Sequence, residues 1–253
     1  MGIRTEISRE KLTIEIHETA AEASSSVARK FVTQVGDAPL SVLGLATGGT
    51  PIECYQKLIE LHRGGEVSFA NATTFNLDEY VGLSADHPQS YRSFMRQNLF
   101  DHIDIGEGQS HIPDGMARSI ESECEAYESR IRASGGIDLQ LLGLGHNGHI
   151  AFNEPGSPET SRTRRIRLTD ETIEKNARFF DSLDDVPTEA ITMGIATILE
   201  CRRIVMLVTG ESKADAVSAM VRGPIDTDCP ASLLRRHDHA TVVLDVAAAT
   251  GLQ

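Results

Sequence analysis

Residues 40–51 read Leu40-Ser41-Val42-Leu43-Gly44-Leu45-Ala46-Thr47-Gly48-Gly49-Thr50-Pro51, and this stretch decides the fold class of the chain. Its first six residues are a short apolar run that is stopped by glycines, which is typical of a buried strand. Pro51 is a favoured residue in the first turn of a helix, and apolar residues at helical spacing follow it as far as Ile59. The stretch therefore predicts a strand, a tight turn and a helix in direct succession.

The same alternation of strand and helix continues on both sides of this unit. Apolar runs or two-residue periods predict further strands at 12–16, 73–77, 137–142, 204–209 and 241–244. Apolar residues at helical spacing predict helices at 20–35, 91–99, 120–131, 188–199 and 214–221. Strands that alternate with helices form parallel βαβ units with helices on both faces of the sheet. No repeat or Pro/Ser-rich linker interrupts the pattern, so we expect one domain over residues 1–253.

Charge and composition exclude several classes of partner. The net charge of −13 argues against nucleic acid, because binding to a phosphate backbone needs clustered Lys and Arg. No apolar run approaches the ~20 residues of a membrane span, and the first 18 residues lack the apolar core of a signal peptide. The four cysteines form no C-x-x-C pair, which favours reduced thiols. We therefore expect a cytoplasmic protein with no membrane or nucleic-acid partner.

The turn after the first predicted strand has the composition of an anion site. Thr47, Gly48, Gly49 and Thr50 offer free backbone N–H groups and two hydroxyls directly before a helix. A simple strand-to-helix turn also favours glycine, so this alternative stays open. The stretch is not a Walker loop, because it lacks the G-x-x-x-x-G-K-[ST] pattern.

Two carboxylates, Asp78 and Glu79, follow the predicted strand at 73–77. Acids at such a position either cap a helix or act as a catalytic acid/base pair. These two residues alone do not distinguish the alternatives. Because ligands of parallel sheets collect beyond the carboxyl ends of the strands, the position itself is one where function is expected.

A glycine-rich segment with a histidine follows the predicted strand at 137–142. Residues 143–155 read Gly-Leu-Gly-His-Asn-Gly-His-Ile-Ala-Phe-Asn-Glu-Pro and contain a formal G-x-G-x-x-G. That fingerprint must open a helix, whereas Pro155 soon follows here, so nicotinamide binding is disfavoured. H-E-x-x-H is absent and glycines break the segment, which disfavours a metal site. A loop that holds His149 near Glu154 remains, and this is an acid/base arrangement.

Lys213 lies just after the strand at 204–209 and at the start of a helix, where a cation is unfavourable for the helix dipole. A lysine at this position is better explained by a bound anion that it faces, although a solvated surface lysine is the open alternative. Arg178 carries little information by itself.

Taken together, these residues resemble the glucosamine-6-phosphate deaminase family of amino-sugar isomerases. The resemblance rests on segments 45–51, 75–82, 148–155, 161–164, 176–180 and 210–214. The six segments cover nearly the whole chain in the family's order and spacing.

The resemblance implies a modified Rossmann-like three-layer αβα sandwich with a mostly parallel central sheet. It also implies conversion of glucosamine 6-phosphate and water to fructose 6-phosphate and ammonia, with no metal or other cofactor. By resemblance, Asp78 moves the C2 proton to C1, His149 assists ring opening, and Glu154 orients or relays protons to His149. The residues expected to bind the substrate phosphate are Thr47, Gly48, Gly49, Thr50, Arg178 and Lys213. A mobile lid is expected around residues 160–187.

Two departures from the family pattern stand out. Many relatives have Asp where this chain has Asn147, so we expect Asn147 to act in the catalytic set through hydrogen bonds without charge. Relatives that the N-acetylated substrate activates have a Lys at the position of Ile166. We therefore expect an unregulated enzyme that is a monomer or a small homo-oligomer.

Two other functions compete with this interpretation. The related 6-phosphogluconolactonases share the phosphate turn and a Gly-His loop, but are expected to lack segments 78–80 and 152–155 as they stand here. Sugar-phosphate sensor domains of transcription regulators resemble the same fold. They carry an N-terminal helix-turn-helix, for which the 19 residues before the first predicted helix leave no room.

Overall fold

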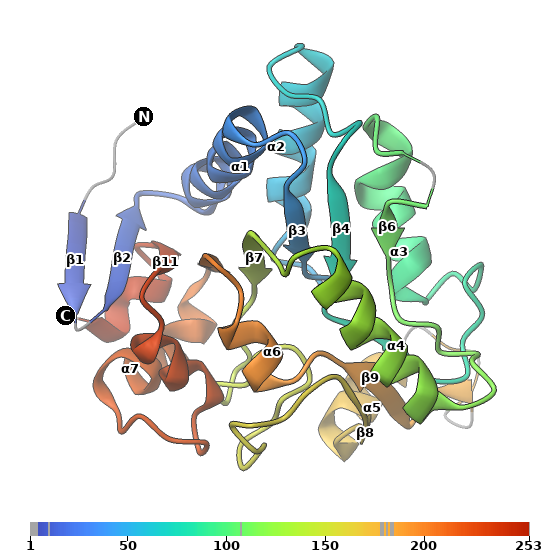
Figure 1. Cartoon of the computed structure of the whole chain (residues 1–253). Coiled ribbons are helices and arrows are strands. Elements are labelled where there is room, and N and C mark those ends of the chain that lie inside the picture. The colour runs from blue at the N-terminus through green and yellow to red at the C-terminus, as the bar shows by residue number, and fades with distance from the viewer. Residues whose placement is uncertain are drawn as a thin grey trace.

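The structure is a computed structural model that describes residues 5–9, 11–106, 108–177, 180, 182 and 185–252. Its main sheet has eight strands in the order β1-β2-β11-β10-β7-β3-β4-β6 (Figure 1). The strands are β1 (Thr5–Arg9), β2 (Leu12–His17), β3 (Val42–Leu45), β4 (Thr73–Asn76), β6 (Ser110–His111), β7 (Leu139–Leu142), β10 (Ile204–Val208) and β11 (Ala240–Asp245). All neighbouring strands are parallel except β1 and β2, which form an antiparallel hairpin. The expected mostly parallel sheet is confirmed.

The helices cover both faces of this sheet. They are α1 (Ala20–Asp37), α2 (Ile52–Arg63), α3 (Tyr91–Asn98), α4 (Ile120–Ala133), α5 (Asp170–Ala177), α6 (Ile195–Leu199) and α7 (Ala214–Arg222). Short 3-10 helices are η1 (Phe100–His102), η3 (Glu211–Lys213), η4 (Pro230–Arg236) and η5 (Ala248–Leu252). The chain crosses from β2 to β3 and from β3 to β4 in one direction, and from β7 to β10 and β11 in the other. Because such crossovers are right-handed, α1 and α2 cover one face and α6 and α7 the other.

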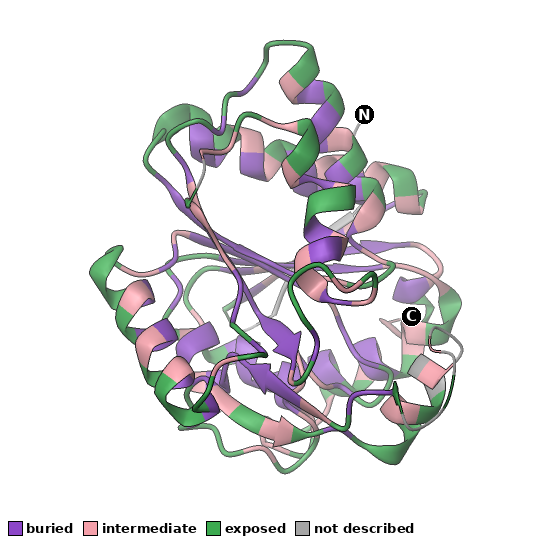
Figure 2. Cartoon of the chain, turned by 90° about the vertical axis from the view of Figure 1, so that its right-hand side faces the viewer, coloured by how far each residue is buried: buried purple, intermediate pink, exposed green. Residues whose placement is uncertain are grey.

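Burial follows this three-layer arrangement. Every residue of β3, β7 and β10 is buried, as expected for strands that are covered on both faces. On α1, the residues Val27, Phe31 and Val35 are buried at the spacing that the sequence predicts. Figure 2 shows the buried strands through the middle of the molecule and helices that are buried toward the sheet and exposed outward. In the described part of the chain, no helix has the length and apolar character needed to cross a membrane.

A second, three-stranded antiparallel sheet was not expected from the sequence. It contains β5 (Asp78–Tyr80), β9 (Glu189–Thr192) and β8 (Arg164–Arg167) in that order. The predicted helix over 188–199 is therefore wrong in its first half, since β9 occupies 189–192 and only Ile195–Leu199 is helical. Pairing with β5 and β8, which are distant in sequence, decides the conformation of β9. Short apolar runs are ambiguous between strand and helix until such partners are known.

The order of the strands creates a switch point between β7 and β3. From β3 the chain goes on to β4 on one side, and from β7 it goes on to β10 on the other side. Connections that leave neighbouring strands in opposite directions open a crevice at the carboxyl ends of those strands. The fold therefore predicts a binding site beside the turn after β3 and the loop after β7.

Candidate functional site

A cavity of about 310 Å³ occupies this crevice. Its lining comes from the turn after β3, the end of β4, the loop after β7 and the segment after β10. Polar or glycine residues in its lining include Thr47, Gly48, Gly49, Thr50, Asp78, Tyr91, Gly145, His146, His149 and Lys213. The topology thus brings four segments that are separated in sequence to one edge of the sheet, as the sequence predicts. Arg178 lies outside the described residues.

The turn after β3 presents an uncapped helix start to the cavity. Gly48 has a φ of +99°, a left-handed conformation that a residue with a Cβ atom rarely adopts. Helix α2 begins directly afterwards, and its N-cap residue Pro51 makes no side-chain capping hydrogen bond. The first N–H groups of a helix lack partners within the helix and carry a partial positive charge. The turn can therefore bind a phosphate or another anion.

Lys213 brings a full positive charge to the same cavity. It is the N-cap residue of α7, and its Nζ donates a hydrogen bond of 2.8 Å to the carbonyl oxygen of Leu144. The predicted position of this lysine at the start of a helix is confirmed. The hydrogen bond to Leu144 also connects the segment after β10 to the loop after β7. Lys213 therefore both places a positive charge in the cavity and helps to hold two of the segments that line it.

The structure assigns different roles to the adjacent carboxylates Asp78 and Glu79, whose roles the sequence did not decide. The carboxylate of Glu79 accepts hydrogen bonds from the backbone N–H groups of Tyr80 and Tyr91 at 2.9 Å, and from that of Arg92 at 3.0 Å. Tyr91 and Arg92 are the first residues of α3, so Glu79 caps this helix. Asp78 instead lines the cavity, and no hydrogen bond to its carboxylate comes from the described residues. Capping and a candidate proton-transfer role thus belong to different residues of the pair.

The environment of Asp78 makes its carboxylate a strong base. Burial raises the pKa of Asp78 to about 8, and the negative charge of the adjacent Glu79 adds to this rise. A carboxyl group with such a pKa binds and releases protons near neutral pH. This matches what a general acid/base needs, because proton transfer is most effective when the pKa is close to the working pH.

His149 and Glu154 come together as predicted, and Asn147 lies between them. Nδ1 of His149 is 2.8 Å from Oδ1 of Asn147 and 3.3 Å from Oε1 of Glu154. The amide Nδ2 of Asn147 donates to Oε2 of Glu154 at 2.7 Å. These hydrogen bonds, with that from His149 first, lower the pKa of Glu154 below its ordinary value. Glu154 is therefore a carboxylate at neutral pH.

This network determines the tautomer of His149. An ionised carboxylate only accepts hydrogen bonds, so the Asn147 amide must direct its NH₂ group to Glu154 and its oxygen to His149. Nδ1 of His149 then carries a proton, and the neutral ring keeps its lone pair on Nε2. Gly145 allows the ring to sit where it does, since a Cβ atom at that position would approach the His149 ring to 2.3 Å. His149 can therefore accept a proton through Nε2.

Several residues that build the site carry no sequence signal strong enough to single them out. Tyr91 lines the cavity and donates a hydrogen bond of 3.1 Å to the hydroxyl of Tyr80. Phe152 also lines it, and the backbone N–H of Phe152 bonds Oγ1 of Thr192 in β9 at 3.1 Å. Ala151 adopts a φ of +51°, a conformation that costs a residue with a Cβ atom roughly 1 kcal/mol. The small antiparallel sheet, which the sequence did not reveal, contacts Tyr91 through Tyr80 in β5 and Phe152 through Thr192 in β9.

Asn153 and Arg164 hold the loop that carries His149 and Glu154 in place. The buried Asn153 donates through Nδ2 to the carbonyl oxygens of Ile150 and Met193 at 3.0 and 2.8 Å. Its Oδ1 accepts a hydrogen bond of 2.7 Å from Nη1 of Arg164 in β8. The residue next to Glu154 is thus fixed on both sides, which holds the loop that carries His149 and Glu154.

The arrangement combines three chemical capacities in one cavity: an anion-binding turn with a lysine, a buried carboxyl group of raised pKa, and an imidazole with a defined tautomer. In the described ranges, no three His, Cys, Asp or Glu side chains gather in a way that could hold a metal ion. Proton transfer at a bound anionic substrate is the chemistry that these groups support.

Comparison with known proteins gives consistent matches along the chain. A sequence profile described as glucosamine-6-phosphate isomerases/6-phosphogluconolactonase matches residues 14–243. A glucosamine-6-phosphate deaminase from Rhodopirellula baltica is 56% identical over 239 residues, which are 94% of this chain and 95% of that protein. One from Shewanella woodyi is 52% identical over 241 residues, or 95% of this chain and 91% of that protein.

Solved structures agree with these matches. A monomeric glucosamine-6-phosphate deaminase superposes with a TM-score of 0.91 at 47% identity, covering 94% of this chain and 99% of its own. The 6-phosphogluconolactonase of Trypanosoma brucei superposes with a TM-score of 0.77 at 22% identity, covering 95% and 98%. The second likeness shows a shared fold alone.

Proposed function

The chain belongs to the family of glucosamine-6-phosphate isomerases and 6-phosphogluconolactonases, and we propose that it is a glucosamine-6-phosphate deaminase. The observation that carries this proposal is the identity of 56% to a deaminase over 94% of the chain. The cavity supplies the groups that the reaction needs. The substrate is D-glucosamine 6-phosphate, and the products with water are D-fructose 6-phosphate and ammonia.

The phosphate of the substrate binds at the turn after β3. The N–H groups and hydroxyls of Thr47, Gly48, Gly49 and Thr50 donate hydrogen bonds to its oxygens, and Lys213 neutralises part of its charge. Arg178 is assigned to the same phosphate on the basis of the sequence motif alone. Binding of this remote group positions the reacting end of the sugar, and this lowers the entropic part of the barrier.

His149 opens the sugar ring. Its Nε2 accepts the proton of the C1 hydroxyl and returns a proton to the ring oxygen, which gives the open-chain aldehyde. Asn147 and Glu154 hold Nδ1–H during this step, and the Glu154 carboxylate stabilises the imidazolium that forms. Proton shuttling by a single histidine needs such a fixed orientation.

Asp78 then transfers a proton between two carbons. Its carboxylate removes the C2 proton, and the carboxylic acid that results gives a proton to C1. A proton also passes from the amine nitrogen to O1, so C1 becomes a CH2OH group and C2 becomes an imine carbon. Water adds to C2, the C–N bond breaks and ammonia leaves. The overall change is hydrolysis of a C–N bond, and we therefore assign the enzyme to the hydrolases.

A segment beside the cavity is proposed to act as its lid. Helix α5 contributes Glu171 and Thr172 to a smaller cavity of about 180 Å³ that His146 and His149 also line. Oε2 of Glu171 lies 3.2 Å from Nε2 of His146. Helix α5 thus lies beside His146 and His149, and we propose that α5, within the expected lid segment 160–187, moves when the substrate enters.

Location and assembly are proposals of the same kind. Cys54, Cys124 and Cys201 are buried thiols, and none of the four cysteines forms a disulfide. This supports a reducing compartment such as the cytoplasm. A monomer or small homo-oligomer is proposed, in line with the monomeric state of the deaminase whose structure superposes with this chain.

One assay tests the function directly. Purified protein is incubated with glucosamine 6-phosphate, without added metal or nucleotide, and ammonia and fructose 6-phosphate are measured in parallel. We expect both products in equal amounts. Hydrolysis of 6-phosphogluconolactone without ammonia release from the amino sugar would contradict the proposal.

A further inference from the structure

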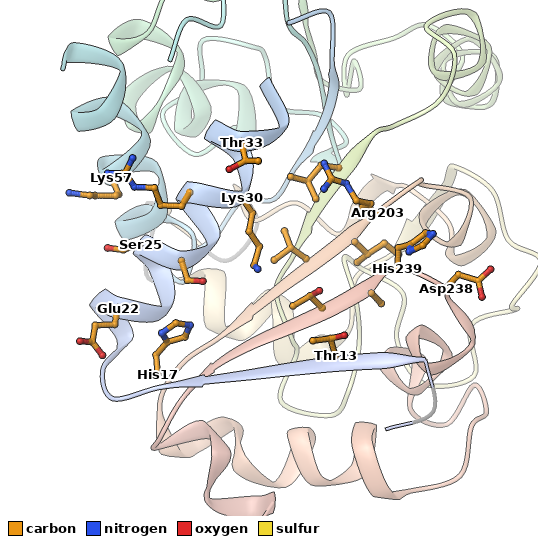
Figure 3. A pocket seen from close by; sticks show the side chains of 17 residues that line it. Thr13, His17, Glu22, Ser25, Lys30, Thr33, Lys57, Arg203, Asp238 and His239 are labelled. Atoms are coloured by element: carbon orange, nitrogen blue, oxygen red, sulfur yellow. The ribbon is translucent and has the colours of Figure 1, made fainter. Parts of the chain in front are cut away.

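A larger cavity, of about 910 Å³, lies on one face of the main sheet under helix α1 (Figure 3). Its charged groups are engaged with one another. Three of the cations that line it, Lys30, Lys57 and Arg29, form ion pairs with Glu15, Glu60 and Glu66, respectively. These pairs connect α1 to β2 and to the segment after α2, so they serve the fold. The side chains of the small antiparallel sheet, in contrast, face the candidate active site.

Three side chains form a row across the small sheet: Asp78 in β5, Thr192 in β9 and Arg164 in β8. Thr192 is the register partner of Asp78 on one side and of Arg164 on the other. Directly opposed residues of neighbouring antiparallel strands point to the same face of a sheet. The candidate base therefore shares one face of the small sheet with Thr192 and Arg164.

The other two members of the row contact the loop after β7. Oγ1 of Thr192 accepts a hydrogen bond of 3.1 Å from the backbone N–H of Phe152. Nη1 of Arg164 donates to Oδ1 of Asn153 at 2.7 Å. Phe152 and Asn153 directly precede Glu154, which bonds the imidazole of the candidate site. The row thus has the base at one end and holds the acid/base loop at its middle and its other end.

The backbone at the end of β9 makes the same connection. The N–H of Met193 donates to the carbonyl oxygen of Leu77, the residue before Asp78, at 2.7 Å. Its carbonyl oxygen accepts a hydrogen bond of 2.8 Å from Nδ2 of Asn153. Thr192 itself is fully buried. The end of β9 therefore lies between the strand that carries the base and the loop that carries the imidazole.

The N–H group that Thr192 binds belongs to a tight turn. The N–H of Asn153 donates to the carbonyl oxygen of Ile150 at 3.0 Å, and Ala151 between them has a φ of +51°. Residues with a Cβ atom rarely adopt this conformation, and it persists only where surrounding contacts maintain it. Thr192 supplies one such contact, to the residue directly after Ala151.

We propose that Thr192 is a positioning residue that fixes the loop of His149 and Glu154 relative to Asp78, an inference that rests on the proposed function. In that reaction His149 acts on the C1 hydroxyl and the ring oxygen, and Asp78 acts on C2 and C1. The two groups thus serve neighbouring atoms of one substrate, and a displacement of about 1 Å between them is enough to slow the reaction strongly. The substrate phosphate binds at the turn after β3, on a separate segment of the lining. Thr192 should therefore affect proton transfer more than binding.

The test compares three variants of the whole protein. Thr192→Val keeps the shape of the side chain and removes the oxygen that accepts the Phe152 N–H. Thr192→Ser keeps this oxygen. Thr197→Val is the matched control, because Thr197 is also buried and its hydroxyl donates to Oε1 of Glu128 at 2.6 Å, outside both cavities of the candidate site.

Hydrogen exchange of the Phe152 amide, followed by NMR, measures the contact without any reaction. An amide that loses its acceptor opens to water more often. We expect exchange at least about tenfold faster in Thr192→Val than in the wild type. In Thr192→Ser and Thr197→Val the rate should stay within about threefold of the wild-type rate.

Ammonia release from glucosamine 6-phosphate measures the consequence. In Thr192→Val, kcat should fall about tenfold or more, whereas Thr192→Ser should stay within about threefold of the wild type and Thr197→Val within about twofold. Binding is measured by calorimetry with 2-amino-2-deoxyglucitol 6-phosphate, which has no carbonyl at C1 and cannot react. Its Kd should stay within about threefold in every variant.

The proposal is overturned if the Phe152 amide of Thr192→Val exchanges at the wild-type rate, or if this variant keeps its kcat. It is also overturned if Thr192→Ser or Thr197→Val loses as much kcat as Thr192→Val, or if the Kd rises as much as kcat falls. A wild-type protein that releases no ammonia would contradict the proposed function instead, and the exchange rates would still show whether Thr192 holds the loop.

Discussion

Oδ1 of Asn147 accepts a hydrogen bond from Nδ1 of His149 at 2.8 Å. An amide oxygen at this position directs the ring as well as a carboxylate would, because both accept the Nδ1 proton. The amide differs from a carboxylate in that it carries no charge. A carboxylate stabilises the imidazolium by opposite charge, whereas the amide orients the ring without adding a charge.

Asn147→Asp should therefore change how activity depends on pH. We expect the acid limb of kcat/KM to move to higher pH by about one unit, because one more charge at contact distance favours the imidazolium. At pH values on or below the acid limb, kcat/KM of the variant should be lower than that of the wild type. Near pH 8 the two values of kcat/KM should be similar. A pair of pH–rate profiles checks this. Coincident acid limbs, or a shift to lower pH in the variant, would show that Asn147 does not control His149.

Asp78→Asn should reduce kcat by ~10²-fold or more, since it removes the proposed base and keeps the shape of the side chain. Binding of the sugar phosphate should change little. Asp86→Asn is a suitable control, because Asp86 is exposed and outside the cavity. If Asp78→Asn keeps most of the activity, Asp78 is not the base.

Asp78→Asn should also stabilise the fold at alkaline pH. The pKa of Asp78 is about 8 in the folded protein and near 3.8 when exposed, so the folded state binds more protons than the unfolded state between these values. Stability that is present below pH 3.8 is therefore lost as the pH rises through 8. Asp78→Asn lacks this loss, and we expect a gain of at least about 1 kcal/mol at pH 8 over pH 5, relative to the wild type. Urea denaturation at both pH values measures it, and an equal difference at both would contradict the raised pKa.

Glu79→Gln should affect both stability and the pH profile. The variant weakens the two hydrogen bonds that Glu79 accepts from the first residues of α3, and we expect destabilisation of about 1 kcal/mol or more. Burial is the larger cause of the raised pKa of Asp78, and the variant removes the smaller cause, the charge of Glu79, so the pH at which Asp78 becomes a base should fall. Glu121→Gln, in the first turn of α4, is the matched control. An unchanged pH–rate profile would mean that Glu79 stabilises α3 and has no effect on Asp78.

Lys213→Ala should act mainly through the phosphate. Loss of a charge-assisted contact with the substrate should lower kcat/KM for glucosamine 6-phosphate by roughly 10- to 100-fold. Any trace activity on unphosphorylated glucosamine should be unchanged. Lys213 also bonds the carbonyl of Leu144, so equal losses on both substrates would show that this structural contact, and not the phosphate, explains the effect.

The enzyme should not be activated by the N-acetylated substrate. Ile166, in β8, occupies the position where activated relatives have a lysine, and its apolar side chain cannot bind a phosphate. We expect hyperbolic velocity curves for glucosamine 6-phosphate, with or without N-acetylglucosamine 6-phosphate. A sigmoidal curve that becomes hyperbolic with this compound would contradict the prediction.

The sequence by itself determined the succession of the main strands and helices along the chain. It also determined that the sheet is mostly parallel and which segments meet at its carboxyl edge. Local patterns suffice for these features, because a buried strand such as Val42–Leu45 and an amphipathic helix such as α1 are encoded in adjacent residues. The motifs for the phosphate turn and for His149 and Glu154 are also local. The amino-acid sequence alone is therefore enough to locate them.

Only the tertiary structure decided the conformation of residues 189–192 and the separate roles of Asp78 and Glu79. The strand β9 forms because β5 and β8 pair with it, and these partners are distant in the chain. Glu79 caps a helix that begins twelve residues later, which leaves Asp78 to the cavity. Burial of Asp78, and with it a pKa of about 8, likewise comes from segments that the fold brings together. Pairing partners and desolvation depend on distant residues, and so local patterns do not contain them.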